Sequence, residues 1–279
     1  MNSTDLERLE LAVEWLENPT WTARLTDLIG GPVEWAVGQL PARAHEVVSS
    51  ATGAAVHKAL QTAVSTMDRR RRLAPQRWLH RAAAATSGGV GGFFGLPGLA
   101  VELPISTVVM LRSIADVARC EGEDLGAVES RLACVQVFGL GGRGRRDDAA
   151  ETGYYAVRLG LARALGEAAE LIARRGVVDT GAPAVLRLVS AIAARFNVVV
   201  TEKLAVQTLP MVGAACGAAV NLLFVSTFQR VASGHFTVRR LERAWGFEPV
   251  HERYEEIAAG KGYRGPQDRV PSPDEPPER

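Results

Sequence analysis

Two long stretches without a charged side chain constrain this chain more than any other feature. Residues 82–101 include six glycines and one proline, and residues 204–229 form a run of 26 uncharged residues that contains Pro210. Segments this apolar are expected inside a protein core or a lipid bilayer. The rest of the chain places apolar residues at helical spacing and shows no sustained two-residue alternation. We therefore expect an all-α fold, a single multi-helix domain around a glycine-rich apolar helical hairpin.

The helix boundaries are predicted from capping residues, prolines and glycines. Pro104 is suited to the start of a long helix that ends near Glu121, and Asp124 to the cap of a helix over about 126–138. Gly176 is expected to end an amphipathic helix over about 151–174, whose apolar stripe is Tyr154, Val157, Leu161, Leu165, Ala168 and Ile172. Further helices are expected over about 4–17, 21–29, 42–67, from Pro183 to about 199, and over 237–245.

The domain organisation is expected to have three parts. Residues 1–54 are predicted to be an N-terminal helical extension, 55–263 the main helical domain, and 264–279 a Pro-rich tail whose composition is typical of disorder. The N-terminus is acidic and amphipathic and does not resemble a secretory signal. The three cysteines are far apart and form no C-x-x-C pair, which argues against a disulfide framework or a zinc site and fits a reducing compartment. We expect a cytoplasmic protein, at the inner face of the cell membrane if it binds lipid.

Small residues in both apolar stretches indicate close helix packing. Gly213, Gly217 and Asn221 are spaced four apart and therefore share one helix face. Such a face lets another backbone approach closely, and Asn221 then needs a buried partner. The expected partner is the other glycine-rich segment, with insertion of residues 204–229 into a bilayer as the alternative. The glycines assigned to this packing in the first stretch are Gly88, Gly89, Gly91, Gly92 and Gly95.

Charged residues in the helix after Pro104 form a predicted buried polar group. Arg112 and Asp116 stand one turn apart on a largely apolar helix, which favours an intrahelical ion pair, and Glu102 is close enough in sequence to join them. A structural role is preferred to a catalytic one, because buried charges need one another.

A run of arginines precedes the first apolar stretch. Clustered arginines contribute about 1 kcal/mol each near an anionic membrane, and tryptophan suits the headgroup level. The simpler interpretation of this run is a solvated surface. The functional interpretation is contact with a membrane. Nucleic acid is disfavoured, because no stacking platform accompanies the run and the net charge is only +1. The membrane-contact candidates are Arg69, Arg70, Arg71, Arg72, Arg77, Trp78 and Arg81.

The sequence shows no pattern of a catalytic or cofactor site. Gly139-x-Gly141-x-x-Gly144 matches a dinucleotide-binding string, but the expected helix before it and the absence of a βαβ context favour a glycine loop. His45-Glu46 and His251-Glu252 lack the second histidine of a zinc motif. We predict no catalytic residues, no cofactor and no metal.

Four blocks of the chain resemble the EcsC family. They read SGGVGGFFGLPGLAVELPISTVVMLRSIADVA (87–118), ETGYYAVRLGLARAL (151–165), LPMVGAACGAAVNLLFVSTFQ (209–229) and HFTVRRLE (235–242). Glu102 stands where the family more usually has Asp before Leu-Pro. The resemblance covers roughly residues 55–245. It implies an all-helical bacterial protein named from an operon that also encodes an ABC transporter, and it implies no particular activity.

These observations lead to one functional expectation and two alternatives. We expect a non-enzymatic, peripherally membrane-associated accessory protein linked to ABC transport or secretion, the link resting on the resemblance alone. Its partners would be anionic membrane lipid and a membrane transport complex. The alternatives are an enzyme of unknown reaction with a cleft at the glycine-rich hairpin and a purely soluble partner-binding scaffold.

Overall fold

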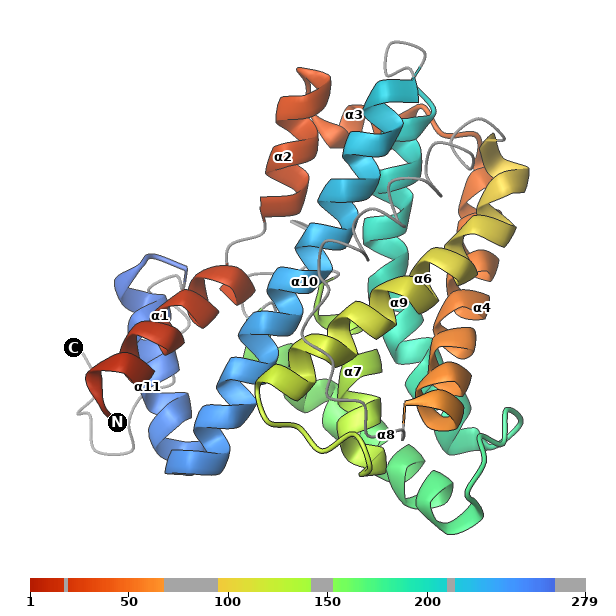
Figure 1. The fold of residues 1–279 in the computed structure, drawn as a ribbon. Coiled ribbons are helices and arrows are strands. Elements are labelled where there is room, and N and C mark those ends of the chain that lie inside the picture. Colours follow the sequence, from red (N-terminus) through yellow and green to blue (C-terminus); the bar gives the residue numbers. More distant parts are fainter. Residues whose placement is uncertain (18–19, 68–94, 142–152, 210–213, 264–279) are drawn as a thin grey trace, which may run out of the picture.

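The fold is helical throughout the residues that the structure describes. The computed structural model describes residues 1–17, 20–67, 95–141, 153–209 and 214–263, and within these ranges it contains no strand. The all-α prediction is therefore confirmed. The helices, which Figure 1 colours from red to blue, are α1 (Ser3–Glu17), α2 (Thr20–Ile29), α3 (Val33–Gly38), α4 (Ala42–Thr66), α6 (Gly95–Cys120), α7 (Val128–Leu140), α8 (Tyr154–Arg175), α9 (Pro183–Gln207), α10 (Ala214–Trp245) and α11 (Phe247–Gly260).

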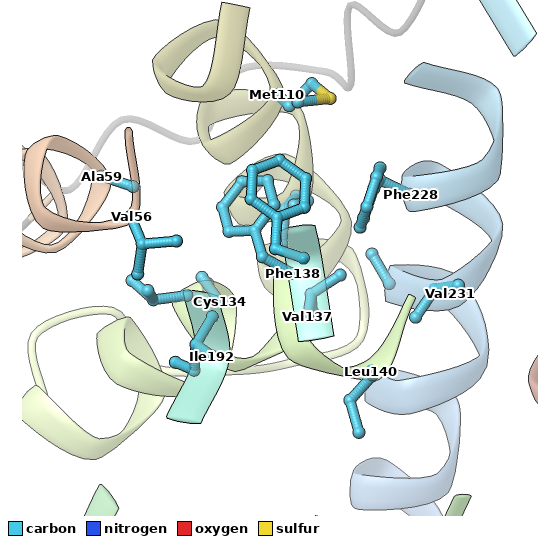
Figure 2. Packing of buried hydrophobic residues seen from close by; sticks show 14 of the residues in the cluster. Val56, Ala59, Met110, Cys134, Val137, Phe138, Leu140, Ile192, Phe228 and Val231 are labelled. Atoms are coloured by element: carbon cyan, nitrogen blue, oxygen red, sulfur yellow. The ribbon is translucent and has the colours of Figure 1, made fainter. Parts of the chain in front are cut away.

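Helix α7 occupies the centre of the bundle. Every residue from Ser130 to Leu140 is buried, because α4, α6, α8, α9 and α10 all pack around this short helix. Phe138 contacts Phe196 of α9 and Phe228 of α10, with ring centroids 5.1 and 5.5 Å apart. Figure 2 shows Phe138 and Phe228 among aliphatic side chains from the neighbouring helices. A helix that is mostly apolar on every side has to be surrounded in this way.

The strongest sequence patterns are confirmed. The stripe of α8 is buried at Tyr154, Val157 and Leu161, and Gly176 ends the helix in the left-handed conformation at φ 70°. Pro183 stands in the first turn of α9, where its missing N–H costs no hydrogen bond. These elements are specified locally, which is why their periodicity was sufficient to predict them.

Three predicted boundaries are wrong. Helix α6 begins at Gly95, so Pro104 lies inside it. Asp124 accepts a hydrogen bond from the Gly126 N–H at 2.9 Å and forms a local turn, while Ala127 occupies the N-cap of α7. The helix predicted over 237–245 is the last part of α10, which is 32 residues long. Burial against neighbouring helices overrides the local stop and start signals at these positions.

The N-terminal region packs against the rest of the fold. The predicted boundary after residue 54 falls inside α4, and α1 packs directly on α10. A Cβ atom at Gly234 would lie 2.7 Å from Cγ of Leu16, so glycine at this position allows the two helices to approach closely. Residues 1–54 therefore contribute to the same core as the remainder of the chain. The predicted tail, 264–279, lies outside the described residues.

Candidate functional site

A network of buried polar side chains joins α8 to α10. The guanidinium of Arg158 donates to both carboxylate oxygens of Glu242, at 2.7 and 2.6 Å, and the Tyr155 hydroxyl donates to the same carboxylate at 2.9 Å. Burial, followed by the charge of Glu242, raises the pKa of Tyr155. Tyr155 therefore stays protonated and donates. Glu242 is fully engaged by these three bonds.

A tyrosine–histidine pair extends the network into the interior. The Tyr154 hydroxyl lies 2.8 Å from Nδ1 of His235, and both side chains are buried. Burial, and then the charges of Arg158 and Arg239, lower the pKa of His235 well below its ordinary value, so the ring is neutral. Because Arg158 donates to the Tyr154 oxygen at 3.3 Å, the hydroxyl hydrogen is free to point at Nδ1. The pair therefore links α8 to α10 inside the core.

A second cluster lies around Glu123, in the turn between α6 and α7. Its carboxylate accepts hydrogen bonds from Ser130 at 2.7 Å, from Arg239 at 2.8 and 3.1 Å, and from Arg243. Burial alone would raise the pKa of Glu123, but the hydrogen bonds and charges of these partners outweigh it and lower the pKa to about 2. Glu123 thus stays ionised and ties α10 to the start of α7.

These two clusters position helices. Their carboxylates are occupied by arginine and hydroxyl donors, and the Tyr154–His235 pair is buried away from solvent. Groups bound in this way orient α8, α10 and the α6–α7 turn relative to one another. Sequence reasoning assigned no role to these residues. Two of the sequence blocks that resemble a known family could have pointed to them. Tyr154 and Arg158 belong to the block 151–165. His235, Arg239 and Glu242 belong to the block 235–242.

The predicted buried polar group is corrected. Arg112 is exposed, and it makes no ion pair with Asp116, whose carboxylate instead accepts a hydrogen bond from Arg119 at 2.9 Å. Glu102 accepts a hydrogen bond from Lys203 of α9 at 3.0 Å. The prediction was wrong because α6 turns position 112 toward solvent, while position 102 faces α9.

The Lys203–Glu102 pair is buried between α6 and α9. The two side chains are 1% and 8% exposed, and the Lys203 Nζ atom lies 4.8 Å from the ring centroid of Phe224. Burial lowers the pKa of Lys203, while Glu102 opposes the shift. An ion pair this deeply buried is costly to break, so it holds the first half of α6 against α9 and α10.

Most of the predicted membrane and glycine residues lie outside the described part of the chain. This is true of all seven membrane-contact candidates between Arg69 and Arg81, and of Gly88, Gly89, Gly91, Gly92 and Gly213. Gly95 is the first residue of α6. Gly217 and Asn221 stand one turn apart in α10, with Asn221 buried. The predicted contact between the two glycine-rich segments therefore stays a prediction.

Four large apolar side chains are exposed on helices that reach one end of the bundle. In Figure 1 the first turns of α6 and α10, the last turn of α9 and helix α3 all lie at its upper end. On these helices Trp35, Val101, Ile105 and Leu222 are 58%, 66%, 56% and 40% exposed. Val101 and Ile105 are one turn apart, so they form part of one face of α6. We call these four side chains the apolar end.

Two helices of the described chain have the length and composition of a membrane span. They are residues Gly98–Cys120 in α6 and Pro183–Gln207 in α9, with mean hydropathies of 1.5 and 1.6. Both pack within the bundle, and core helices of soluble proteins often meet the same criteria. The stretch 204–229 does not form one continuous helix, because α9 ends at Gln207 and α10 begins at Ala214.

Fold and site together define a helical-bundle protein whose central and C-terminal sequence blocks are joined by buried polar bonds. Among the described residues, no group of three or more His, Cys, Asp or Glu side chains is arranged to hold a metal ion. The model of the EcsC protein family matches residues 7–241, so the chain belongs to the EcsC family. No curated protein and no solved structure matches it. The match begins within α1, which agrees with the packing of the N-terminal helices into the common core.

Proposed function

We propose that this protein is a non-enzymatic accessory protein that associates peripherally with anionic membranes through the apolar end. The observation that carries the proposal is the exposure of Trp35, Val101, Ile105 and Leu222. They belong to helices α3, α6 and α10, which reach the upper end of the bundle in Figure 1. Moving apolar side chains from water into a membrane is favourable, by about 25 cal/mol for each Å² of apolar surface that is buried. An exposed tryptophan suits the interface between headgroups and acyl chains.

The sequence before α6 adds a charge contribution to this proposal. The run from Arg69 to Arg81 contains six arginines and Trp78, and it precedes the helix that carries Val101 and Ile105. A basic segment and an apolar surface in the same protein are a combination that gives reversible binding to anionic lipid. The proposed second partner, a membrane transport complex, rests on the family resemblance alone.

Vesicle flotation tests the membrane proposal. We expect purified protein to float with vesicles of phosphatidylcholine and phosphatidylglycerol, and much less with phosphatidylcholine alone. Binding should weaken as salt rises, because the Debye length falls from about 10 Å at 0.1 M to about 3 Å at 1 M. Replacing Arg69, Arg70, Arg71 and Arg72 with Gln should reduce flotation, since it removes four positive charges.

A matched pair of variants separates the apolar end from general hydrophobicity. Val101→Gln with Ile105→Gln should reduce flotation, because both side chains are exposed at the apolar end. Leu159→Gln with Leu186→Gln should leave it unchanged, since these side chains are similarly exposed but lie on α8 and the first turn of α9. Protein that remains in the soluble fraction with both lipid mixtures would overturn the proposal and leave the scaffold and the enzyme as the alternatives.

A further inference from the structure

Helix α11 packs on the bundle through a single face. Val250, Tyr254 and Ala258 are fully buried and are spaced four residues apart, so they lie one turn after another on that face. The helix packs on α1 and α10, and Figure 1 shows it beside α1 at the edge of the bundle. The family match ends at residue 241, so α11 is an addition to the matched part of the chain.

The surface under α11 is aromatic and carries one carboxylate. The ring centroid of Tyr254 lies 5.5 Å from that of Tyr154 and 5.0 Å from that of Tyr155, both on α8. The ring of His251 lies 4.4 Å from that of Tyr155, and the Tyr254 hydroxyl donates to Glu17 of α1 at 2.7 Å. We call this part of α1, α8 and α10 the docking surface. A helix that presents anchors at i, i+4 and i+7 to such a surface is a common mode of binding between separate chains.

A single residue, Gly246, connects α10 to α11. Its N–H still donates to the Glu242 carbonyl at 2.9 Å, as in a continuing helix, and the chain then turns at a φ of 90° and a ψ of 161°. This backbone region is essentially restricted to glycine. Pro249 has no N–H to bond the Trp245 carbonyl, so α10 and α11 are separate units. A change in the backbone of Gly246 therefore redirects α11 without altering either helix.

Two exposed aromatic side chains flank this hinge. Trp245 and Phe247 are 43% and 38% exposed, although the Trp245 indole N–H donates to Asp5. If two chains exchange α11, Phe247 of each chain occupies the place of Phe247 in the other, two residues beyond the other chain's Trp245. The two copies of Trp245 and Phe247 then gather where the chains cross. Such a crossing removes apolar surface from water, which is favourable.

We propose that the docking surface also binds α11 of a second copy of this chain, which gives a dimer whose two chains exchange α11. The contacts of α11 are all kept, because the same residues meet between the copies as within one chain. The cost is limited to opening two Gly246 hinges and joining two chains, and the aromatic side chains at the crossing offset it. The proposal does not rest on membrane binding.

The variant Gly246→Ala tests the hinge. A Cβ atom at this position would lie 3.7 Å from Cδ of Pro249, an ordinary contact, so alanine acts through the backbone alone. Its strain disfavours the folded-back hinge about tenfold in each chain and is relieved when the hinge opens. Because each dimer opens two hinges, the dissociation constant should fall about a hundredfold. Sedimentation equilibrium of the full chain over a range of concentrations measures it.

Gly176→Ala is the matched control. Gly176 also has a positive φ, 70°, and nothing lies within 4 Å of the Cβ position, so alanine is again strained by the backbone alone. It connects α8 to α9, which lie in the middle of the chain and have no free end to exchange. The dissociation constant should stay that of the unaltered protein. Equal dimer fractions in the two variants, or Gly246→Ala that stays monomeric at every concentration, would overturn the proposal.

A crosslink in the unaltered chain distinguishes exchange of α11 from any other dimer. Lys261, just after α11, forms an ion pair with Glu14 of α1 at 3.7 Å, and a carbodiimide converts such a pair into an amide. Unlabelled and ¹⁵N-labelled chains are unfolded in urea, refolded together and crosslinked. In the dimer fraction, mass spectrometry should find Lys261–Glu14 peptides that combine the two labels. A dimer in which every such peptide carries a single label, or a chain that forms no dimer, would refute the exchange.

Discussion

Replacing Glu242 with glutamine removes the centre of the network that joins the two sequence blocks. In the native protein its carboxylate accepts two hydrogen bonds from Arg158 and one from Tyr155. The side chains of Arg158 and Glu242 are only 15% and 10% exposed. The variant would leave the Arg158 guanidinium buried without its counter-charge, facing an amide that is a poorer acceptor.

The expected loss follows from this burial. Breaking one side of a buried ion pair typically costs about 3–5 kcal/mol. Both side chains keep some contact with water, at 15% and 10% exposure, which lowers this cost relative to a fully buried pair. We therefore expect Glu242→Gln to lower the free energy of unfolding by about 2–4 kcal/mol.

Urea denaturation followed by circular dichroism measures this loss. The double variant Arg158→Met with Glu242→Gln should lose less than the sum of the single losses, because it also removes the buried charge. Glu167→Gln is the matched control: its carboxylate binds Arg163 and Arg187 on the surface, and its unfolding midpoint should not change. A midpoint for Glu242→Gln equal to that of the control, or strictly additive losses in the double variant, would refute the reasoning.

Two further predictions concern packing and acid stability. Gly234→Ala should destabilise the protein by about 1–3 kcal/mol, because its Cβ would overlap Leu16, whereas Gly160→Ala, with open space around it, should stabilise by about 0.5–1 kcal/mol. Thermal denaturation checks both, and equal effects would contradict the close packing of α1 on α10. The lowered pKa of Glu123 stabilises the fold above pH 4.5, and this contribution should be lost as pH falls toward 2. Denaturation midpoints measured from pH 6 to pH 2.5 should therefore fall less steeply for Glu123→Gln, and an identical slope would contradict this account.

The sequence could predict those features that depend on neighbouring residues. The helical class, the stripe of α8 and its end at Gly176 follow from periodicity and from the conformational freedom of glycine. Gly139, Gly141 and Gly144 were expected to form a loop after a helix, but Gly139 lies inside α7, which ends at Leu140 with Gly141 as its C-cap. Gly144 lies outside the described residues. A local signal failed where packing outweighed it. Pro104 was expected to begin a helix, yet α6 continues through it.

The sequence by itself determined that this chain is helical, where most helices lie and which family it resembles, because these depend on spacing over a few residues. Only the tertiary structure decided which charges meet. Glu102 binds Lys203, 101 residues away, instead of joining Arg112 and Asp116, and Arg158 binds Glu242, 84 residues away. One sequence carries no information on how two distant helices rotate against each other. That rotation is set by burying apolar faces around α7, and the polar partners follow from it.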